Sequence, residues 1–298
     1  ARRSSNLRWL EGKPVEIVSA DFSDKESLKK AVQGVDYVYH IGGLTAAKEY
    51  DEFLRGNRDA TRNIIEATYE VNPGIKRFLF VSSQTVCGPS PSLENPIVET
   101  VECKPITSYG KSKLAAEQEV LKFRGKLPFT IVRAPAVYGP RDTAIFSVFK
   151  AVKMGLGTIV GFNEKYISLI HSDDLSRGII EAAESEKAKD EIYFVSSEKL
   201  FTWPQLIGII KEKMGKKFVI TLRLPHPVVL TVAGISEFFG KFSSKPPVFN
   251  YEKGIDFIQT YWTCSTKKAM KDFGYSQKMS VEDGMADTIK WYKENKWL

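Results

Sequence analysis

The sequence predicts an α/β protein, in which a doubly wound parallel sheet is joined to a smaller, helix-rich C-terminal lobe. Short apolar runs that suit buried parallel strands alternate with amphipathic helical segments through the first half of the chain. Two of these runs, 35–43 and 78–83, end in glycines or hydroxyl residues, as expected where a sheet binds a ligand. Beyond Pro140 the alternation is lost, and helix signals, aromatic residues and prolines dominate.

Each element of the first half follows from its local pattern. Apolar, β-branched and aromatic runs predict strands at 15–21, 35–43, 78–83 and 129–134. Helical periodicity predicts helices at 25–33, 51–69 and 109–123. Ser23 or Asp24 is expected to cap the first helix. On the helix at 109–123, we place Lys111, Glu117 and Lys122 on the solvated side.

The second half is expected to be less regular. We predict a helix at 144–154, a short strand at 167–170, a helix at 175–184 opened by Asp173 and Asp174, and a strand at 191–195. Residues 201–298 read as helices that cover the carboxyl edge of the sheet. We therefore assign residues 1–141 and about 167–197 to the sheet domain, and residues 142–166 and 198–298 to a substrate-binding lobe.

Composition excludes several classes of function. The chain has 298 residues and a formal net charge of +7, without a long basic block, which disfavours a nucleic-acid partner. No signal peptide or bilayer-spanning apolar run is present, so we expect a cytoplasmic protein with no membrane partner. The three cysteines and three histidines lack metal-ligand spacing, so no metal is predicted; they are Cys87, Cys103, Cys264, His40, His171 and His226.

Three residues form a candidate proton-transfer group. The run at 78–83 delivers Ser83 to the tip of a buried strand, and Tyr109 and Lys113 lie one turn apart on one helix face. A neighbouring ammonium is expected to lower the pKa of a phenol, so that Tyr109 exchanges a proton with a substrate hydroxyl or ketone. No side chain here can accept a hydride, which must go to a bound nicotinamide. The pattern thus predicts alcohol–ketone interconversion on a small-molecule substrate.

Tyr-x-x-x-Lys alone is a weak signal, because the chain holds a second copy at Tyr292 and Lys296. That copy follows no strand and no serine, and we interpret it as a solvated helix end. The strand and serine that precede Tyr109 are what favour a catalytic interpretation there.

Several motifs, taken together, resemble the extended short-chain dehydrogenase/reductase family, also called the NAD-dependent epimerase/dehydratase family. They cover residues 1 to about 200, and the segment 261–274 is similar to the 3β-hydroxysteroid dehydrogenase and dihydroflavonol reductase branch. The motifs are Ser-Ala-Asp-Phe at 19–22, Tyr-Val-Tyr-His-Ile-Gly-Gly at 37–43, Asn57, Val-Ser-Ser-Gln-Thr-Val-Cys-Gly at 81–88, Tyr-Gly-Lys-Ser-Lys at 109–113, Arg-Ala-Pro-Ala-Val-Tyr-Gly-Pro-Arg at 133–141 and Ile-His-Ser-Asp-Asp-Leu at 170–175.

The resemblance implies a Rossmann-type sheet that binds a dinucleotide, with roles for individual residues. Ser83, Tyr109 and Lys113 would be the catalytic triad, with Asn57 beneath the cofactor as a further catalytic residue. The remaining residues would contact the cofactor at its adenine, its dinucleotide backbone, its nicotinamide amide or a phosphate; they are Asp21, Phe22, Gly42, Gly43, Thr45, Pro135 and Arg141.

The start of the sequence departs from that family. Its members begin with a strand and a glycine-rich turn that binds the pyrophosphate, whereas this sequence starts where their second strand ends. The first βα unit, on the order of 30 residues, is therefore expected to be absent from this sequence. Arg2 and Arg3 stand where an acidic residue would favour NAD, and guanidinium groups suit a 2′-phosphate. We predict NADP as the preferred cofactor, with NAD as the alternative.

The substrate is expected to be a sterol-, flavonoid- or terpenoid-like molecule and not a nucleotide sugar. Sugar epimerases of the family carry polar anchors where this chain has Ala136 and Ile167. Nine aromatic residues of the C-terminal lobe could line an apolar pocket instead: Phe201, Trp203, Phe238, Phe239, Phe242, Phe249, Phe257, Tyr261 and Trp262. The alternatives are a nucleotide-sugar 4-epimerase or dehydratase, and a non-catalytic dinucleotide-binding regulator.

Other residues are given structural roles. His40 is expected to be a hydrogen-bonded core residue, and helix capping is preferred to metal binding for His171 with its two aspartates. Cys87 replaces a tyrosine that is common in the family and is expected to widen the pocket. The family resemblance also implies a homodimer through the helices after Asn57 and at Tyr109, with outer faces formed by Ile64, Ala67, Leu114, Ala115, Gln118 and Leu121.

Overall fold

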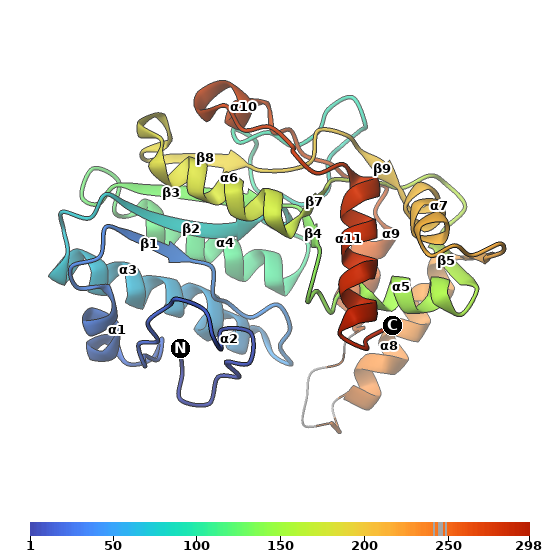
Figure 1. The fold of residues 1–298 in the computed structure, drawn as a ribbon, viewed down its shortest axis with the longest axis horizontal. Coiled ribbons are helices and arrows are strands. Elements are labelled where there is room, and N and C mark those ends of the chain that lie inside the picture. The colour runs from blue at the N-terminus through green and yellow to red at the C-terminus, as the bar shows by residue number, and fades with distance from the viewer. Residues whose placement is uncertain (241, 244–246, 248) are drawn as a thin grey trace.

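A four-stranded parallel sheet in the order β1–β2–β3–β8 runs through the computed structural model (Figure 1). Its strands are β1 (Tyr37–His40), β2 (Arg77–Ser83), β3 (Phe129–Ala134) and β8 (Glu191–Phe194). The structure describes residues 1–240, 242–243, 247 and 249–298. The parallel sheet with helices on both faces confirms the predicted α/β fold.

The two faces of the sheet are covered by different helices (Figure 1). Along β2, Phe78 and Phe80 pack into the core toward α3 (Ala60–Val71) and α4 (Ser108–Leu121), and α1 (Lys25–Val32) lies against α3. Leu79 and Val81 alternate to the opposite face, beneath α6 (Ser172–Glu184), which α10 (Lys267–Phe273) flanks. A strand buried on both faces explains why its sequence is a continuous apolar run.

A single helical stretch carries Asn57 to the edge of the sheet. It comprises α2 (Tyr50–Phe53), a π-helical segment (Leu54–Asp59) and α3. The π-helical turn contains Asn57, which is 2% exposed. Such turns within helices often mark functional positions.

The C-terminal half adds a second lobe with its own core. Phe149, Leu206, Ile210 and Met285 are buried there among neighbouring helices. The elements of this half besides α6, β8 and α10 are β4 (Ala136–Tyr138), α5 (Phe146–Lys153), β5 (Leu156–Val160), β6 (Tyr166–Ile167), β7 (Leu169–His171), β9 (Phe201–Thr202), α7 (Trp203–Lys213), β10 (Ile220–Leu224), α8 (His226–Gly240), α9 (Tyr251–Ile258), β11 (Tyr261–Trp262) and α11 (Val281–Glu294). The predicted domain boundaries remain a prediction.

Three local predictions were wrong. Residues 15–21 form no strand; apart from bonds to near neighbours in sequence, the backbone there bonds to Ala1, through Ala20 N–H to Ala1 O at 3.0 Å and the Ala1 amino group to Val18 O at 2.7 Å. The cap of α6 is His171, whose Nδ1 accepts from the Asp173 N–H at 3.3 Å. Tyr292 is fully buried in the second lobe and donates to Asp142 O at 2.7 Å.

The homodimer remains a prediction, and one of its expected contact residues was misplaced. Ala67 is fully buried against the sheet side, whereas Gln118 is exposed. Among the residues that the structure describes, no helix has the length and apolar character needed to cross a bilayer.

Candidate active site

Ser83 ends β2 at the carboxyl edge of the sheet and starts a short 3-10 turn, Gln84–Val86. Its Oγ accepts from the Thr85 N–H at 3.3 Å and from the Thr85 hydroxyl at 3.0 Å. These two bonds fix the side-chain rotamer, so the Ser83 hydroxyl is oriented before any substrate arrives.

Tyr109 is brought to Ser83 by the close approach of α4 to this turn. A Cβ on Gly110 would lie 2.6 Å from the Thr85 carbonyl oxygen, so only glycine permits the contact. Burial raises the pKa of Tyr109, while a hydrogen bond with Ser83 lowers it. The phenol is therefore protonated at neutral pH, contrary to the expectation that a neighbouring ammonium would lower its pKa. In this state Tyr109 is suited to donate a proton to a ketone.

Lys113 lies one turn further along α4 and is 4% exposed. Its Nζ donates to the Val81 carbonyl oxygen at 2.8 Å and lies 4.2 Å from the centre of the Phe80 ring. Burial lowers the pKa of Lys113 to about 8, despite the opposing effect of Glu117. The sequence predicted this convergence of Ser83, Tyr109 and Lys113, while their catalytic roles remain predictions.

Asn57 ties the loop after β1 to α4. Its Oδ1 accepts from the Leu44 N–H at 2.7 Å, and its amide group donates to Leu44 O at 3.0 Å and to Ser112 Oγ at 2.9 Å. A Cβ on Gly43 would lie 2.6 Å from Asn57 Oδ1 and 3.9 Å from Lys113 Nζ. Glycine at position 43 therefore lets the loop backbone pack directly against the Asn57 amide, beside the Lys113 ammonium.

The other predicted cofactor residues lie around this edge at varying distances. Gly42 and Thr45 are exposed in the loop after β1, and a Cβ on Gly42 would lie 3.0 Å from the Phe22 ring. Phe22 packs edge-on against His40 at 5.2 Å between ring centres. Asp21 accepts from the Ser23 hydroxyl at 2.7 Å, and this bond lowers the pKa of Asp21.

The remaining predicted cofactor residues are less closely connected to the triad; they are Arg2, Arg3, Pro135 and Arg141. Arg2 and Arg3 are exposed, and the charge of Arg2 contributes to lowering the pKa of Asp21. Pro135 is buried between β3 and β4. Arg141 lies over the Trp9 ring, 5.6 Å from the ring centre.

A cavity of about 530 Å³ opens beside Tyr109. It is lined by Phe53, whose ring lies 6.1 Å from the Tyr109 ring, and by Ser108 at the start of α4. Glu252 of α9 also lines it and accepts from the Ser108 hydroxyl at 2.6 Å and from the Ser108 N–H at 2.9 Å. The remaining lining residues are Ala47, Lys48, Glu49, Tyr50, Glu237, Gly240, Pro247 and Asn250.

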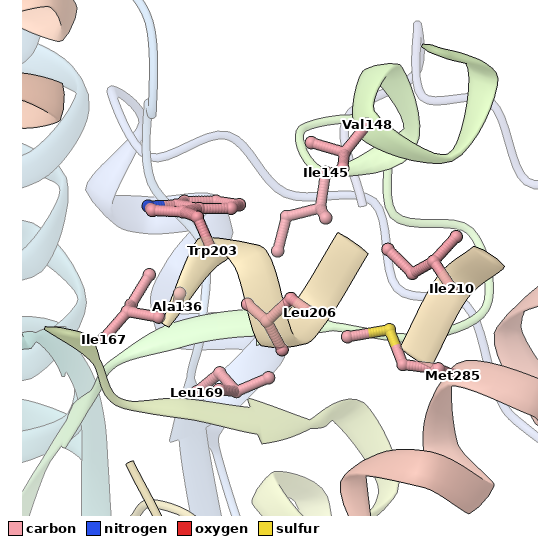
Figure 2. A pocket seen from close by; sticks show the side chains of 9 residues that line it. All are labelled: Ala136, Ile145, Val148, Ile167, Leu169, Trp203, Leu206, Ile210 and Met285. Carbon is pink, nitrogen blue, oxygen red and sulfur yellow. The ribbon is translucent and has the colours of Figure 1, made fainter. Parts of the chain in front are cut away.

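A second, apolar cavity of about 10 Å³ contains the two positions that bear on substrate class (Figure 2). Ala136 and Ile167 lie there with Trp203, and the other lining residues are also apolar: Ile145, Val148, Leu169, Leu206, Ile210 and Met285. The surroundings of Ala136 and Ile167 thus offer no polar anchor.

Of the nine aromatic residues proposed to line an apolar pocket, Trp203 lines the small apolar cavity, and none lines the larger cavity in the part of the chain that the structure describes. Phe201 is buried in the core of the second lobe. Phe238, Phe239 and Phe242 are 56, 66 and 79% exposed at and just beyond the end of α8. The cavity beside Tyr109 is instead lined largely by polar side chains.

Sequence analysis missed a buried ion pair behind the triad. Arg133 of β3 and Glu117 of α4 are 4% and 1% exposed, and their side chains bond at 3.0 Å (Nε–Oε1) and 2.7 Å (Nη2–Oε2). The prediction that Glu117 lies on a solvated helix side was therefore wrong. The available signal was an arginine within an otherwise apolar strand, since a buried charge requires a partner.

His40 has a structural role. His40 is 2% exposed and lies 2.9 Å from Thr61 Oγ1, and burial lowers its pKa to about 3. This confirms its interpretation as a core residue. Within the described part of the chain, no group of three potential ligands is placed to hold a metal ion.

Comparisons with known proteins identify relatives of this chain. A model of the NAD-dependent epimerase/dehydratase family matches residues 1–196. Ceramide reductase from Caulobacter vibrioides is 28% identical over 286 residues, covering 95% of this chain and 82% of that protein. Sterol-4-alpha-carboxylate 3-dehydrogenase (decarboxylating) from Dictyostelium discoideum is 24% identical, covering 90% of this chain and 84% of that protein. UDP-glucuronic acid 4-epimerase from Bacillus cereus, solved with UDP-glucuronic acid and NAD, superposes with a TM-score of 0.75 at 21% identity, covering 97% of this chain and 85% of that one.

Proposed function

Because this chain belongs to the NAD-dependent epimerase/dehydratase family, we propose that it is a dehydrogenase or reductase for a secondary alcohol or ketone of an apolar, non-nucleotide molecule. The observation that supports the reaction type is the convergence of Ser83, Tyr109 and Lys113 at one sheet edge. A bound nicotinamide dinucleotide would supply or accept the hydride.

Each residue of the triad has a chemical task in this proposal. Ser83, oriented by Thr85, would donate a hydrogen bond to the substrate oxygen. Tyr109, held as a neutral phenol, would donate its proton to that oxygen as negative charge develops. Lys113, with a pKa lowered to about 8, would then favour the phenolate that remains and ease the return of a proton. Asn57 would hold the loop at Gly43 in place.

Two features favour an apolar substrate over a nucleotide sugar. Ala136 and Ile167 lie in an apolar cavity, where the family's sugar epimerases need polar anchors. Three carboxylates, those of Glu49, Glu237 and Glu252, line the cavity beside Tyr109 against one lysine, and they oppose an anionic diphosphate. The named activities of the ceramide and sterol relatives agree with this choice.

The test is reduced-cofactor consumption with a panel of sterol, sphingoid and terpenoid ketones, measured at 340 nm with the purified protein. We expect net oxidation of the reduced cofactor that Tyr109→Phe slows by about 10²–10⁴-fold, as the loss of a general acid implies. Tyr69→Phe, on an exposed surface, serves as the matched control and should leave the rate unchanged. Conversion of a UDP-sugar without net cofactor turnover would instead support the 4-epimerase, and binding without any turnover would support the regulator.

We propose NADP as the preferred cofactor, on the basis of the exposed Arg2 and Arg3, of which Arg2 acts on the charge of Asp21. In a fluorescence titration, NADPH should bind more tightly than NADH. The double substitution Arg2→Ser and Arg3→Ser should weaken NADPH by about tenfold, the loss of about one charge-assisted contact, and leave NADH unchanged. NADH that binds tenfold more tightly than NADPH would contradict this choice.

A further inference from the structure

Two thiols lie in contact just behind the triad. The Sγ atoms of Cys87 and Cys103 are 3.1 Å apart. Cys87 follows the 3-10 turn that begins at Ser83, and Cys103 precedes α4, which carries Tyr109. The Lys104 N–H donates to the Cys87 carbonyl oxygen at 3.4 Å, so the backbones of the two segments are also joined.

A buried cation faces both sulfurs. The Arg133 guanidinium donates through Nη1 to Cys87 Sγ at 3.2 Å and through Nη2 to Cys103 Sγ at 3.3 Å. Its other donors bind Glu117. A guanidinium in this position stabilises negative charge on either sulfur, which is the condition for a reactive cysteine.

The two cysteines differ in ways that give them separate tasks. Cys87 is 4% exposed, whereas Cys103 is only half-buried. The hydrogen bond from Cys87 and the charge of Arg133 lower the pKa of Cys103, while the same hydrogen bond and burial raise the pKa of Cys87. Cys103 is therefore the more accessible sulfur and the one on which negative charge is favoured, and Cys87 is the neighbour that donates to it.

We propose that Cys103 and Cys87 form an oxidation site at which a peroxide converts the two thiols reversibly into a disulfide. The Cys103 thiolate attacks one peroxide oxygen, the O–O bond breaks, and a sulfenic acid and hydroxide form. Cys87 then loses its proton, its sulfur attacks Cys103 Sγ, and hydroxide leaves as water. Two thiols lose two electrons in total, and hydrogen peroxide is reduced to two waters.

The bond would join the segment after Ser83 directly to the segment before Tyr109. It requires the sulfurs to move from 3.1 Å to about 2.05 Å apart. Because the two segments already share a backbone hydrogen bond, that movement is small. Cys264 is held elsewhere: its thiol bonds to the Ser168 side chain, whereas the Cys87 and Cys103 sulfurs contact each other.

The test treats the full, reduced chain with hydrogen peroxide and counts thiols under denaturing conditions. Of the three thiols, we expect two to be lost, and digestion should yield one peptide pair containing Cys87 and Cys103 that is lighter by two hydrogens. Dithiothreitol should restore all three thiols. These readouts need no substrate, so they decide the proposal even if the proposed reaction fails.

Three variants separate the steps. Cys264→Ser is the matched control and should still lose two thiols. Cys87→Ser should stop at a Cys103 sulfenic acid that a 1,3-dione probe labels, and Cys103→Ser should keep both remaining thiols. Circular dichroism should show that each variant is folded. Survival of all three thiols, a linkage to Cys264, or a linkage between two chains would each overturn the proposal.

Discussion

Two buried cations, Lys113 of α4 and Arg133 of β3, differ in how completely they are paired. Arg133 meets a buried carboxylate through two hydrogen bonds, and two sulfurs occupy its remaining contacts. Lys113, one turn before Glu117 on the same helix, meets a single carbonyl oxygen and the face of Phe80. Both are at most 4% exposed, so burial alone does not explain the difference.

The difference separates a structural charge from one available for chemistry. Glu117 raises the pKa of Arg133, whereas burial lowers the pKa of Lys113 to about 8. A group that titrates near neutral pH exchanges protons readily, while a fully paired guanidinium does not. The partly paired cation is thus the one that lies beside Gly43 and follows Tyr109 by one turn.

Removal of the Glu117 carboxylate, which pairs with the Arg133 cation, should have the largest effect on stability. Glu117→Gln leaves Arg133 buried without a counter-charge, and we expect a loss of about 3–5 kcal/mol in the free energy of unfolding. Urea unfolding followed by circular dichroism measures this. The matched control is Glu119→Gln on the same helix, whose partner Lys122 is 63% exposed; it should cost less than about 1 kcal/mol. Equal losses of stability in the two variants would mean that the buried pair stabilises the protein no more than the surface pair does.

Removal of the partly paired cation, Lys113, should have the opposite effect and stabilise the protein. Lys113→Met keeps the length of the side chain and removes a charge that the fold holds at a cost, so we expect the free energy of unfolding to rise by about 1–3 kcal/mol. Cofactor-dependent turnover should be lost in the same variant. Lys111→Met, at an exposed position two residues earlier, should change stability by less than about 0.5 kcal/mol. A destabilised Lys113→Met variant would mean that the ammonium is structural.

The sequence predicted the triad because each of its signals is local. An apolar run ending in Ser83, and Tyr109 four residues before Lys113, need no knowledge of distant contacts. The pairing of Glu117 with Arg133 joins residues 16 positions apart, and a helix carrying alternating charges resembles a solvated one. Only the arginine within an apolar strand indicated that a buried partner existed.

Two of the wrong local predictions, for residues 15–21 and for Tyr292, share one cause. A strand requires a neighbouring strand, and residues 15–21 have the composition of a strand but, within the described chain, bond to Ala1 and to near neighbours in sequence and pair with no strand. Tyr292 was interpreted from its polar sequence neighbours, yet Phe146, Phe149 and Trp297 pack around its ring. Long-range packing, which local patterns do not encode, decided both cases.

The smallest expected effect is a pH dependence of the free energy of unfolding that arises from Lys113 alone. Its pKa is about 8 in the folded protein and 10.5 without burial, so between these values the unfolded chain binds more protons and stability rises with pH. The loss of stability caused by burying the charged form of Lys113 is fully present below about pH 8 and disappears as the pH approaches 10.5. Other groups titrate alike in both proteins, so the stability advantage of Lys113→Met over the unsubstituted protein should shrink across this window.

Urea unfolding of both proteins at intervals from pH 7 to pH 10 measures this change, which the lowered pKa limits to about 3 kcal/mol in total. Glu119→Gln, which removes the partner of the exposed Lys122, provides the comparison, and its difference from the unsubstituted protein should not follow the same curve. An advantage of Lys113→Met that stays constant with pH would place the pKa of Lys113 near its ordinary value, and the two buried cations would then differ in geometry alone.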